Sequence, residues 1–275
     1  NFDERAGDIV YDISSNNLDG SIEGNVTRLN FLGDGLSFGN SDSIVDLSNI
    51  ISGLPQLTTS AWIKLDSNYS SSPDDVITIK VDEDALKIKN NKVHWNIYDG
   101  SGSYTQGVNW EICESNELLE ENKWYHITSV YDDTADNVSL YINGNLDNTC
   151  SITLSMPSNA NIRTIGNYSN LNNFNGNISE FSMWNKILTQ DEIKQIMYSV
   201  PDISDTSLVG YWPFNEGDGT IAYDQSDNEN HGTITSATWI DTAPTIYGDT
   251  IYTSQNIVTI HKLYVENNTS VPTYS

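Results

Sequence analysis

The sequence predicts an all-β protein: an antiparallel two-sheet jelly-roll sandwich with one short helix. Two observations predict the strands. Apolar and polar residues alternate over short runs, and turn-forming residues separate those runs. The third observation is that a helical pattern occurs clearly in only one place, which excludes a fold built from alternating strands and helices. A chain of 275 residues is long enough to bury a full core.

The strands are predicted from apolar residues that recur at every second position. Such spacing places these residues on one face of a half-buried strand. Two of these runs place the following residues on one face: Ala61, Ile63 and Leu65 in residues 59–65, and Ile77, Ile79 and Val81 in residues 76–81.

Two tight hairpins follow from the turn residues. Asn90-Asn91 separates the alternating runs 86–89 and 92–97, and Asn tolerates the positive φ that a two-residue turn needs. Asn143-Gly144 follows the run 138–142 and gives the strongest short signal for a type I′ turn.

One helix is predicted between Thr189 and Pro201. Thr189 can cap its first turn, and Glu192 completes a capping box. Pro201 lies just beyond the expected end of the helix. The residues that recur at helical spacing are Ile193, Ile196 and Met197.

An internal repeat joins the two ends of the chain. Residues 2–22 align without gaps on residues 214–234, with ten identical positions of 21. Both copies contain the pattern Tyr-Asp-x-Ser-x-Asn. Either both copies are edge elements of one closed sandwich, which we favour, or the second copy opens a further module.

Four segments, taken in order, resemble a known family. They are residues 57–65, residues 123–131 with 138–144, residues 174–185 with 188–192, and the Tyr-Asp-x-Ser-x-Asn repeat. Together they resemble the laminin-G-like, concanavalin A-like jelly-roll domain of bacterial, archaeal and viral surface proteins, over residues 2–240. Lectins, pentraxins and glucanases share this fold, so the resemblance implies a fold but no particular ligand.

The resemblance and the strand pattern divide the chain at Pro244. We expect residues 1–244 to form the jelly roll and residues 245–275 to form a last strand pair or a linker to further chain. Four tryptophans within the strand motifs are expected in the core: Trp62, Trp124, Trp184 and Trp212.

Charge excludes two classes of partner. The chain has 38 acidic and 12 basic residues, which gives a net charge of −26. Nucleic acids and anionic membranes attract clustered cations, so neither partner is expected. No apolar run approaches the roughly 18 residues of a membrane helix. The two cysteines, Cys113 and Cys150, are compatible with one disulfide and equally with unpaired core thiols.

No catalytic motif is found. Retaining glycosidases need two carboxyl groups roughly 5–5.5 Å apart, and the E-x-D-x-x-E strand motif of laminarinase-type relatives is missing. The histidines show no zinc-binding spacing, and there is no nucleophile elbow. We therefore expect a protein that is not an enzyme.

A bound Ca²⁺ is expected from the acidity and from the oxygen-rich repeat. Ca²⁺ takes several oxygen ligands, and relatives of the resembled family commonly bind it. The candidate ligands are Asp12, Asn16 and Asp224, with Glu180 as an outside candidate. The alternatives are an Asx-turn at each repeat and a solvated acidic surface.

Two exposed loops are the expected ligand site. Sugar sites combine aromatic rings with amide and carboxylate hydrogen-bonding groups, and loops carry function more often than cores do. The candidates are Tyr98, Asp99, Tyr104 and Trp110 in one loop, and Asn167, Tyr168, Asn172 and Phe174 in the other. The alternative is that the aromatic residues among them fill the core.

The expected function is recognition or adhesion, with a glycan or a surface protein as partner. The module is expected outside the cell, on a cell envelope or a virus particle, within a longer chain or a larger assembly. One alternative is a structural protein of a fibre, capsid or surface layer. A second alternative is a divergent polysaccharide hydrolase or lyase.

Overall fold

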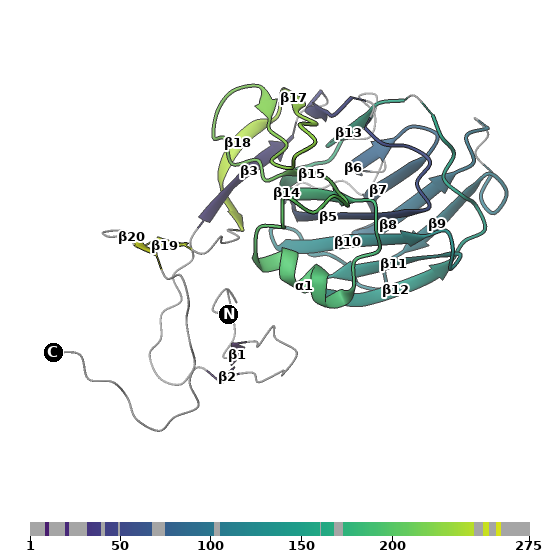
Figure 1. The fold of residues 1–275 in the computed structure, drawn as a ribbon, viewed down its shortest axis with the longest axis horizontal. Helices are drawn as coiled ribbons and strands as arrows, with labels where there is room; N and C mark the ends of the chain where they lie inside the picture. Colours follow the sequence, from purple (N-terminus) through teal and green to yellow (C-terminus); the bar gives the residue numbers. More distant parts are fainter. Residues whose placement is uncertain are drawn as a thin grey trace.

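The computed structural model contains two eight-stranded antiparallel sheets that form a sandwich (Figure 1). It describes residues 9–10, 20–21, 32–39, 42–48, 50–67, 75–101, 105–159, 161–167, 173–244, 250–252 and 257–259. The predicted fold class is therefore confirmed.

The first sheet, called sheet I, has the order β12-β11-β10-β5-β14-β3-β18, and β15 also pairs with β14. Its strands are β3 (Leu32–Phe38), β5 (Gln56–Leu65), β10 (Trp124–Asp132), β11 (Asn137–Ile142), β12 (Asn145–Ser151), β14 (Gly176–Trp184), β15 (Leu208–Trp212) and β18 (Thr238–Pro244).

The second sheet, called sheet II, has the order β16-β17-β4-β13-β6-β7-β8-β9. Its strands are β4 (Ile44–Asp46), β6 (Asp75–Lys80), β7 (Asp84–Lys89), β8 (Lys92–Tyr98), β9 (Trp110–Glu114), β13 (Arg163–Ile165), β16 (Ile221–Ala222) and β17 (Gly232–Thr235). Two further pairs stand apart: β1 (Ile9–Val10) with β2 (Gly20–Ser21), and β19 (Thr250–Tyr252) with β20 (Ile257–Thr259).

The main core fills the space between the sheets. Ala61, Ile63 and Leu65 are fully buried in it, as their alternation predicts. Across from them, Trp95 of sheet II stacks on Tyr131 of sheet I, with ring centroids 5.3 Å apart. Large side chains from both sheets thus interlock, as the close packing of protein interiors requires.

The prediction for residues 76–81 is wrong in part. Ile77 lies in the main core, whereas Ile79 packs with Val76 and Ala85 in a separate small cluster. The cause is a β-bulge, which shifts the register of β6 against β7 between Val76 and Thr78. A bulge adds one residue, so side chains beyond it point to the opposite face.

Both hairpins and the helix are confirmed. Asn90 and Asn91 adopt positive φ between β7 and β8, and Asn143-Gly144 does so between β11 and β12. Helix α1 (Gln190–Tyr198) begins with the predicted capping box between Thr189 and Glu192.

Helix α1 packs on sheet I in a second apolar cluster. Ile193 of the helix is fully buried there beside Trp184 of β14. Trp62 of β5 donates from Nε1 to the carbonyl oxygen of Met197, 3.3 Å away. The helix therefore covers part of the outer face of sheet I, as Figure 1 shows.

One of the four tryptophans expected in the core is only half-buried. Trp124 lies at the start of β10, and Lys64 Nζ stands 5.5 Å from its ring centroid. Its Nε1 donates to the carbonyl oxygen of Thr242. Its neighbour Tyr125 packs in the main core, so Trp124 lies on the opposite, outer face of sheet I.

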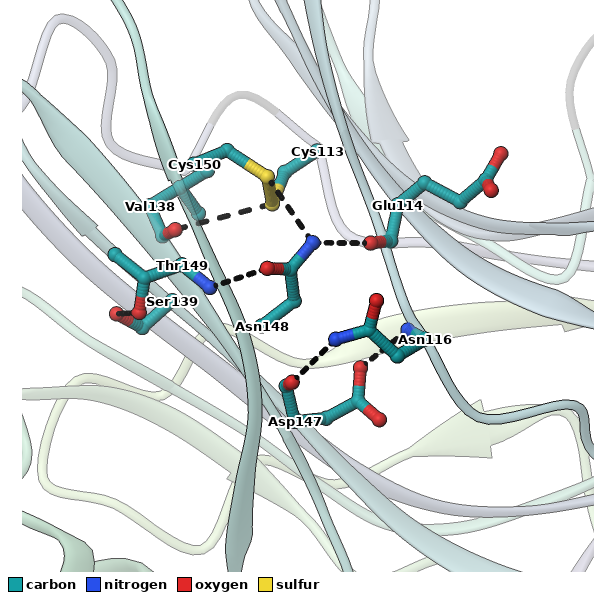
Figure 2. The surroundings of a disulfide bond; sticks show 9 residues. All are labelled: Cys113, Glu114, Asn116, Val138, Ser139, Asp147, Asn148, Thr149 and Cys150. Carbon is teal, nitrogen blue, oxygen red and sulfur yellow. Dashed lines mark hydrogen bonds between the residues drawn. A yellow bond between two sulfur atoms is a disulfide. The ribbon is translucent and has the colours of Figure 1, made fainter.

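A disulfide joins the two sheets at one edge. Cys113 of β9 and Cys150 of β12 are bonded, with their Cα atoms 5.6 Å apart. Figure 2 shows Asn148 beside the bond, donating to Cys150 Sγ and to the carbonyl oxygen of Glu114. Of the two alternatives left open by the sequence, the cysteines therefore form one disulfide and are not unpaired thiols.

The second copy of the repeat closes the opposite edge. Within it, β16 pairs with β17, and β17 pairs with β4 of sheet II. Directly after it, β18 pairs with β3 of sheet I. The second copy is therefore an edge element of this sandwich. The described strands of the first copy, β1 and β2, pair only with each other, so the favoured arrangement with both copies at the edges is not seen.

Candidate functional site

The outer face of sheet II carries the candidate site. Trp95 and Ile97 of β8 point into the main core. The residues between and beside them, His94, Asn96 and Tyr98, therefore lie on the opposite face. Across the sheet, Asn96 pairs with Ala85 of β7 and Ile112 of β9, and Tyr98 pairs with Trp110.

Tyr98 and Trp110 form a stacked aromatic pair at the end of β8 and the start of β9. Their ring centroids are 6.0 Å apart and their planes differ by 15°. Both side chains are half-buried. Lys87 Nζ of β7 stands 5.5 Å from the centroid of Trp110. The pair thus offers a flat, partly accessible aromatic surface with a cation beside it.

Two buried polar groups, one within this pair and one beside it, have no hydrogen-bond partner in the part of the chain that the structure describes. They are the amide of Asn96, at both its nitrogen and its oxygen, and Nε1 of Trp110. Asn96 is fully buried. Leaving a buried polar group unpaired costs about 1–3 kcal/mol, so such groups need an explanation. A ligand that supplies acceptor and donor atoms would satisfy both.

The side chain of Lys87 reaches from β7 across β8 to Trp110 on β9. Lys87 pairs with His94 on β8, and His94 pairs with Glu114 on β9. Because Trp110 lies at the other end of β9 from Glu114, the side chain of Lys87 must cross β8 near Asn96. Lys87 is itself buried, and its ammonium group lies beside the aromatic pair.

Two carboxylates of this region, Asp99 after β8 and Glu114 at the end of β9, are engaged in local bonds. The side-chain hydrogen bond of Ser101 lowers the pKa of Asp99 most, and the bonds from Asn109 Nδ2 and from the backbone N–H of Ser101 lower it further. Glu114 accepts from Lys92 Nζ, which lowers its pKa as well. A general acid for glycoside cleavage needs a raised pKa, so neither group is suited to that role.

Comparison with known proteins places the fold in a family. The model of the concanavalin A-like lectin/glucanases superfamily matches residues 38–194, more than half of the chain. The chain belongs to the concanavalin A-like lectin/glucanase superfamily. A search of curated proteins finds no match.

Several solved structures resemble this superfamily member. A proposed carbohydrate-binding protein from Bacteroides ovatus has a TM-score of 0.63 and 17% identity, over 84% of this chain and 68% of that one. A heptameric SAP-like pentraxin from Limulus polyphemus has a TM-score of 0.46 and 14% identity, over 62% and 83%. The botulinum neurotoxin serotype D binding domain has a TM-score of 0.46 and 24% identity, over 63% and 45%. At these identities the likeness shows the fold alone.

The first predicted ligand loop is brought together in part. Tyr98, Asp99 and Trp110 lie at the same end of sheet II. Tyr104 lies outside the described residues. The predicted aromatic pair thus lies on the outer face of sheet II, and the alternative of a core position does not hold for Tyr98 and Trp110.

The second predicted ligand loop does not join the first. Asn167 follows β13 at the opposite end of sheet II and is 1% exposed. Phe174 is fully buried in the main core, so its assignment to an exposed loop is wrong. Its backbone N–H donates to the carbonyl oxygen of Gly166, which draws the ring inward. Tyr168 and Asn172 lie outside the described residues.

Asp224 does not fit a Ca²⁺ ligand. Its Oδ1 accepts from the backbone N–H groups of Tyr211 and Ser226, and its Oδ2 accepts from Ser226 Oγ and the N–H of Asn230. The carboxylate organises its own turn, which was the alternative interpretation from the sequence. Within the described residues, no group of three or more Asp, Glu, His or Cys could hold a metal ion.

Glu180 also does not fit a Ca²⁺ ligand. It lies at positive φ in a bulge of β14 and accepts a hydrogen bond from the hydroxyl of Tyr211. Burial, with a smaller effect of the Asp34 charge, raises the pKa of Glu180 to about 8. A carboxyl that stays protonated at neutral pH is a poor cation ligand. The other two candidates, Asp12 and Asn16, lie outside the described residues.

Replacing Glu180 should stabilise the protein at alkaline pH. In the unfolded chain Glu180 ionises above its ordinary pKa of 4.5, whereas in the folded protein it holds its proton up to about pH 8. The stability it contributes is therefore complete below pH 4.5 and is lost as the pH rises through 8. Because the side chain keeps some contact with solvent, we expect Glu180→Gln to add about 2 kcal/mol at pH 8.

Urea unfolding at pH 5 and pH 8 measures this effect. The control is Glu121→Gln, which removes one charge from an exposed position of the same acidic protein. The Glu180→Gln gain should grow between the two pH values, and the Glu121→Gln effect should not. Equal gains at both pH values would show that Glu180 is not held neutral.

Asn96 and Lys87 were missed from the sequence. The alternation pattern predicts a strand from the apolar residues of its inward face alone. In the run His94-Trp95-Asn96-Ile97-Tyr98, the amide of Asn96 and the ring of Tyr98 are two positions apart and share the outward face. The sequence therefore contained a signal from which Asn96 could have been found. That Lys87 of the neighbouring strand approaches Trp110 could not be found without the strand order.

Proposed function

We propose that this protein recognises glycans without cleaving them, through the outer face of sheet II. The observation that carries this proposal is the stacked, half-buried pair of Tyr98 and Trp110 beside the unpartnered amide of Asn96. An aromatic surface with a few convergent polar groups is the usual composition of a small-ligand site.

Each group has a role in this site. The ring of Trp110 stacks on the apolar C–H face of a sugar, and Tyr98 supports that ring from its other side. Asn96 offers a donor and an acceptor to adjacent hydroxyl groups, and Trp110 Nε1 offers a second donor. Lys87 Nζ, beside Trp110, can donate to a hydroxyl or carboxylate oxygen of the ligand. Because the strands hold every group, little ordering is needed on binding.

Two further observations support this proposal. The superfamily contains lectins and glucanases, and the similar Bacteroides ovatus structure is described as a proposed carbohydrate-binding protein. Disulfides persist in oxidising compartments, so the Cys113–Cys150 bond supports a location outside the cytoplasm, such as a cell envelope or virion surface. No helix among the described residues is long and apolar enough to cross a membrane.

Removing the Trp110 ring should abolish most glycan binding. We expect Trp110→Ala to weaken binding by at least about tenfold, because stacking and one donor are lost together. The matched control is Trp124→Ala, since Trp124 is also half-buried and also has a lysine Nζ 5.5 Å from its ring centroid, but lies on sheet I. A glycan array selects the ligand, and titration calorimetry measures both variants.

The same titrations test the remaining parts of the proposal. Running them with Ca²⁺ and with EGTA tests the proposed Ca²⁺ stabilisation, for which Asp12 and Asn16 remain the candidates. Equal loss in both tryptophan variants would show that the outer face of sheet II is not the site. Cleavage of a bound polysaccharide would contradict the non-enzymatic role. Binding to an assembly partner but to no glycan would favour the structural alternative.

A further inference from the structure

A row of lysines lies on the outer face of sheet II, next to the aromatic pair. The whole chain has only 12 lysines and arginines against 38 acidic residues. Three of these cations, Lys87, Lys89 and Lys92, occur within residues 87–92 of the β7–β8 hairpin. Such a group of like charges on so acidic a protein needs an explanation. These three residues are called the lysine row.

The register of the hairpin shows that the whole lysine row faces outward. Leu86 and Ile88 of β7 point into the main core, so Lys87 and Lys89 lie on the opposite face. Lys92 of β8 pairs with Lys89, and residues that pair across a sheet share a face. The three ammonium groups are therefore presented on the same side of sheet II as the ring of Trp110.

The lysine row pairs with residues that add to its charge or leave it unbalanced. Lys89 pairs with Lys92, and Lys87 pairs with His94. Like charges directly opposite each other destabilise a sheet, so the stability of the hairpin does not explain this arrangement.

Acidic side chains are scarce on this face. Among the described residues of β6 to β9, the strand register turns one acidic side chain outward, that of Glu114. Its Oε1 lies 2.5 Å from Lys92 Nζ, and its Oε2 lies 3.2 Å from His94 Nε2. Three lysines thus share the outward face of these strands with one carboxylate.

The acidity of the rest of the molecule does not cancel this local charge. At physiological ionic strength the Debye length is about 8 Å, so charges farther away are largely screened. A ligand on the outer face of sheet II is therefore influenced mainly by the lysine row and Glu114. An anionic ligand is attracted to this face and repelled by acidic surfaces elsewhere, which confines it to the site.

The lysine row continues from the aromatic pair along the strands. Lys87 Nζ lies 5.5 Å from the centroid of the Trp110 ring. Glu114, which Lys92 contacts across the sheet, is four residues from Trp110 on β9, a distance of about 13 Å. A sugar stacked on Trp110 would therefore lie beside Lys87, and the following sugars of the same chain would lie towards Lys92 and Lys89.

We propose that the glycan recognised at this face is acidic: a linear chain that carries anionic groups along its length and lies along β8 from Trp110 towards Lys92. This inference rests on the proposed function, because it names the ligand class of the same site. Lys87 donates to the anionic group of the stacked sugar, and Lys89 and Lys92 donate to the groups that follow. Hydrogen bonds to a charged partner are roughly twice as strong as neutral ones, so they should dominate the choice of ligand.

Pairs of oligosaccharides that differ in charge test this inference. The first pair is a tetramer of galacturonic acid and its fully methyl-esterified, uncharged form. The second pair is a κ-carrageenan tetrasaccharide with and without its sulfate groups, which distinguishes sulfate from carboxylate recognition. We expect the charged member of at least one pair to bind at least about tenfold more tightly, measured by titration calorimetry at low salt. This preference should shrink as the salt concentration rises.

Substitutions in the lysine row should change the ratio of charged to neutral affinity. Lys87→Gln should lower the ratio by about tenfold. The matched control is Lys64→Gln, because Lys64 Nζ also lies 5.5 Å from a tryptophan ring centroid but on sheet I. Glu114→Gln removes the carboxylate from this face and should raise the ratio. If the buried Lys87 cannot be replaced without unfolding, Glu114→Gln and the double variant Lys89→Gln, Lys92→Gln decide the matter.

Two results would overturn the acidic ligand class. The first is a charged member that binds no more tightly than its neutral member in both pairs. The second is a ratio that the variants of the lysine row change no more than Lys64→Gln does. Tight binding of a neutral member that is lost in Trp110→Ala would keep the proposed function and remove only the acidic class. Binding of a charged member that Trp110→Ala leaves intact would instead contradict the proposed site.

Discussion

Arg163→Ala should destabilise the protein by about 3–5 kcal/mol, one of the largest losses that a single substitution can cause here. Arg163 of β13 and Asp84 of β7 form a bidentate ion pair, in which Nη1 of Arg163 lies 3.2 Å from Oδ2 of Asp84 and Nη2 lies 2.5 Å from Oδ1. Their side chains are 1% and 2% exposed. Removing the guanidinium leaves the carboxylate of Asp84 buried and uncompensated.

The neighbours of this pair cannot replace the lost charge. Lys80 Nζ is held by the carbonyl oxygens of Ile50 and Asn161, and burial lowers its pKa. Glu83 is bound by Ser52 and Gly53, and burial raises its pKa. Because each group already has fixed partners, repacking after the loss of Arg163 would break further bonds.

Two controls separate the cost of an unpaired buried charge from that of a lost ion pair. Lys123→Ala breaks the exposed pair between Lys123 and Glu120, whose side chains are 57% and 66% exposed, and should leave stability nearly unchanged. Arg163→Met with Asp84→Leu removes both charges and should recover most of the loss. If the double variant is as unstable as Arg163→Ala, shape rather than charge explains the effect.

The positions of several strands, turns and the helix along the chain could be predicted from the sequence, because each of these signals is local. The Asn143-Gly144 turn and the capping box of Thr189 and Glu192 depend on a few adjacent residues, and both are confirmed. The alternation predicted for residues 59–65 is found in the structure, because β5 pairs with β10 without a bulge. Where a bulge interrupts a strand, as between Val76 and Thr78, the same rule assigns Ile79 to the wrong face.

The candidate site could be predicted only in part because it depends on strand order. Tyr98 and Trp110 are close in sequence and were found together. Lys87 is near Trp110 only because β7, β8 and β9 are consecutive neighbours in sheet II. Phe174 was misassigned because a polar Asn-rich sequence on both sides of it suggested exposure, whereas its backbone bond to Gly166 turns it into the core.

Removing the Cys113–Cys150 disulfide should cost about 4 kcal/mol. The bond closes a loop of 37 residues in the unfolded chain, and the loss of that constraint raises the entropy of the unfolded state. Cys113 is fully buried, but replacing a cysteine by alanine leaves only a small gap in the core. We therefore expect Cys113→Ala with Cys150→Ala to fold, with a urea midpoint well below that of the oxidised protein.

The folded state should remain closed at this edge without the bond, because hydrogen bonds also hold it. Asp147 of β12 accepts from the backbone N–H of Asn116, and Asn148 donates to the carbonyl oxygen of Glu114 (Figure 2). Asp147 also accepts from the backbone N–H of Glu117. Hydrogen exchange of β9 and β12 under native conditions should thus change little in the double variant, although its global stability falls. Fast exchange confined to β9 and β12 would instead show that the disulfide clamps the folded edges. A loss below about 1 kcal/mol would mean that these edges already stay close together in the unfolded chain.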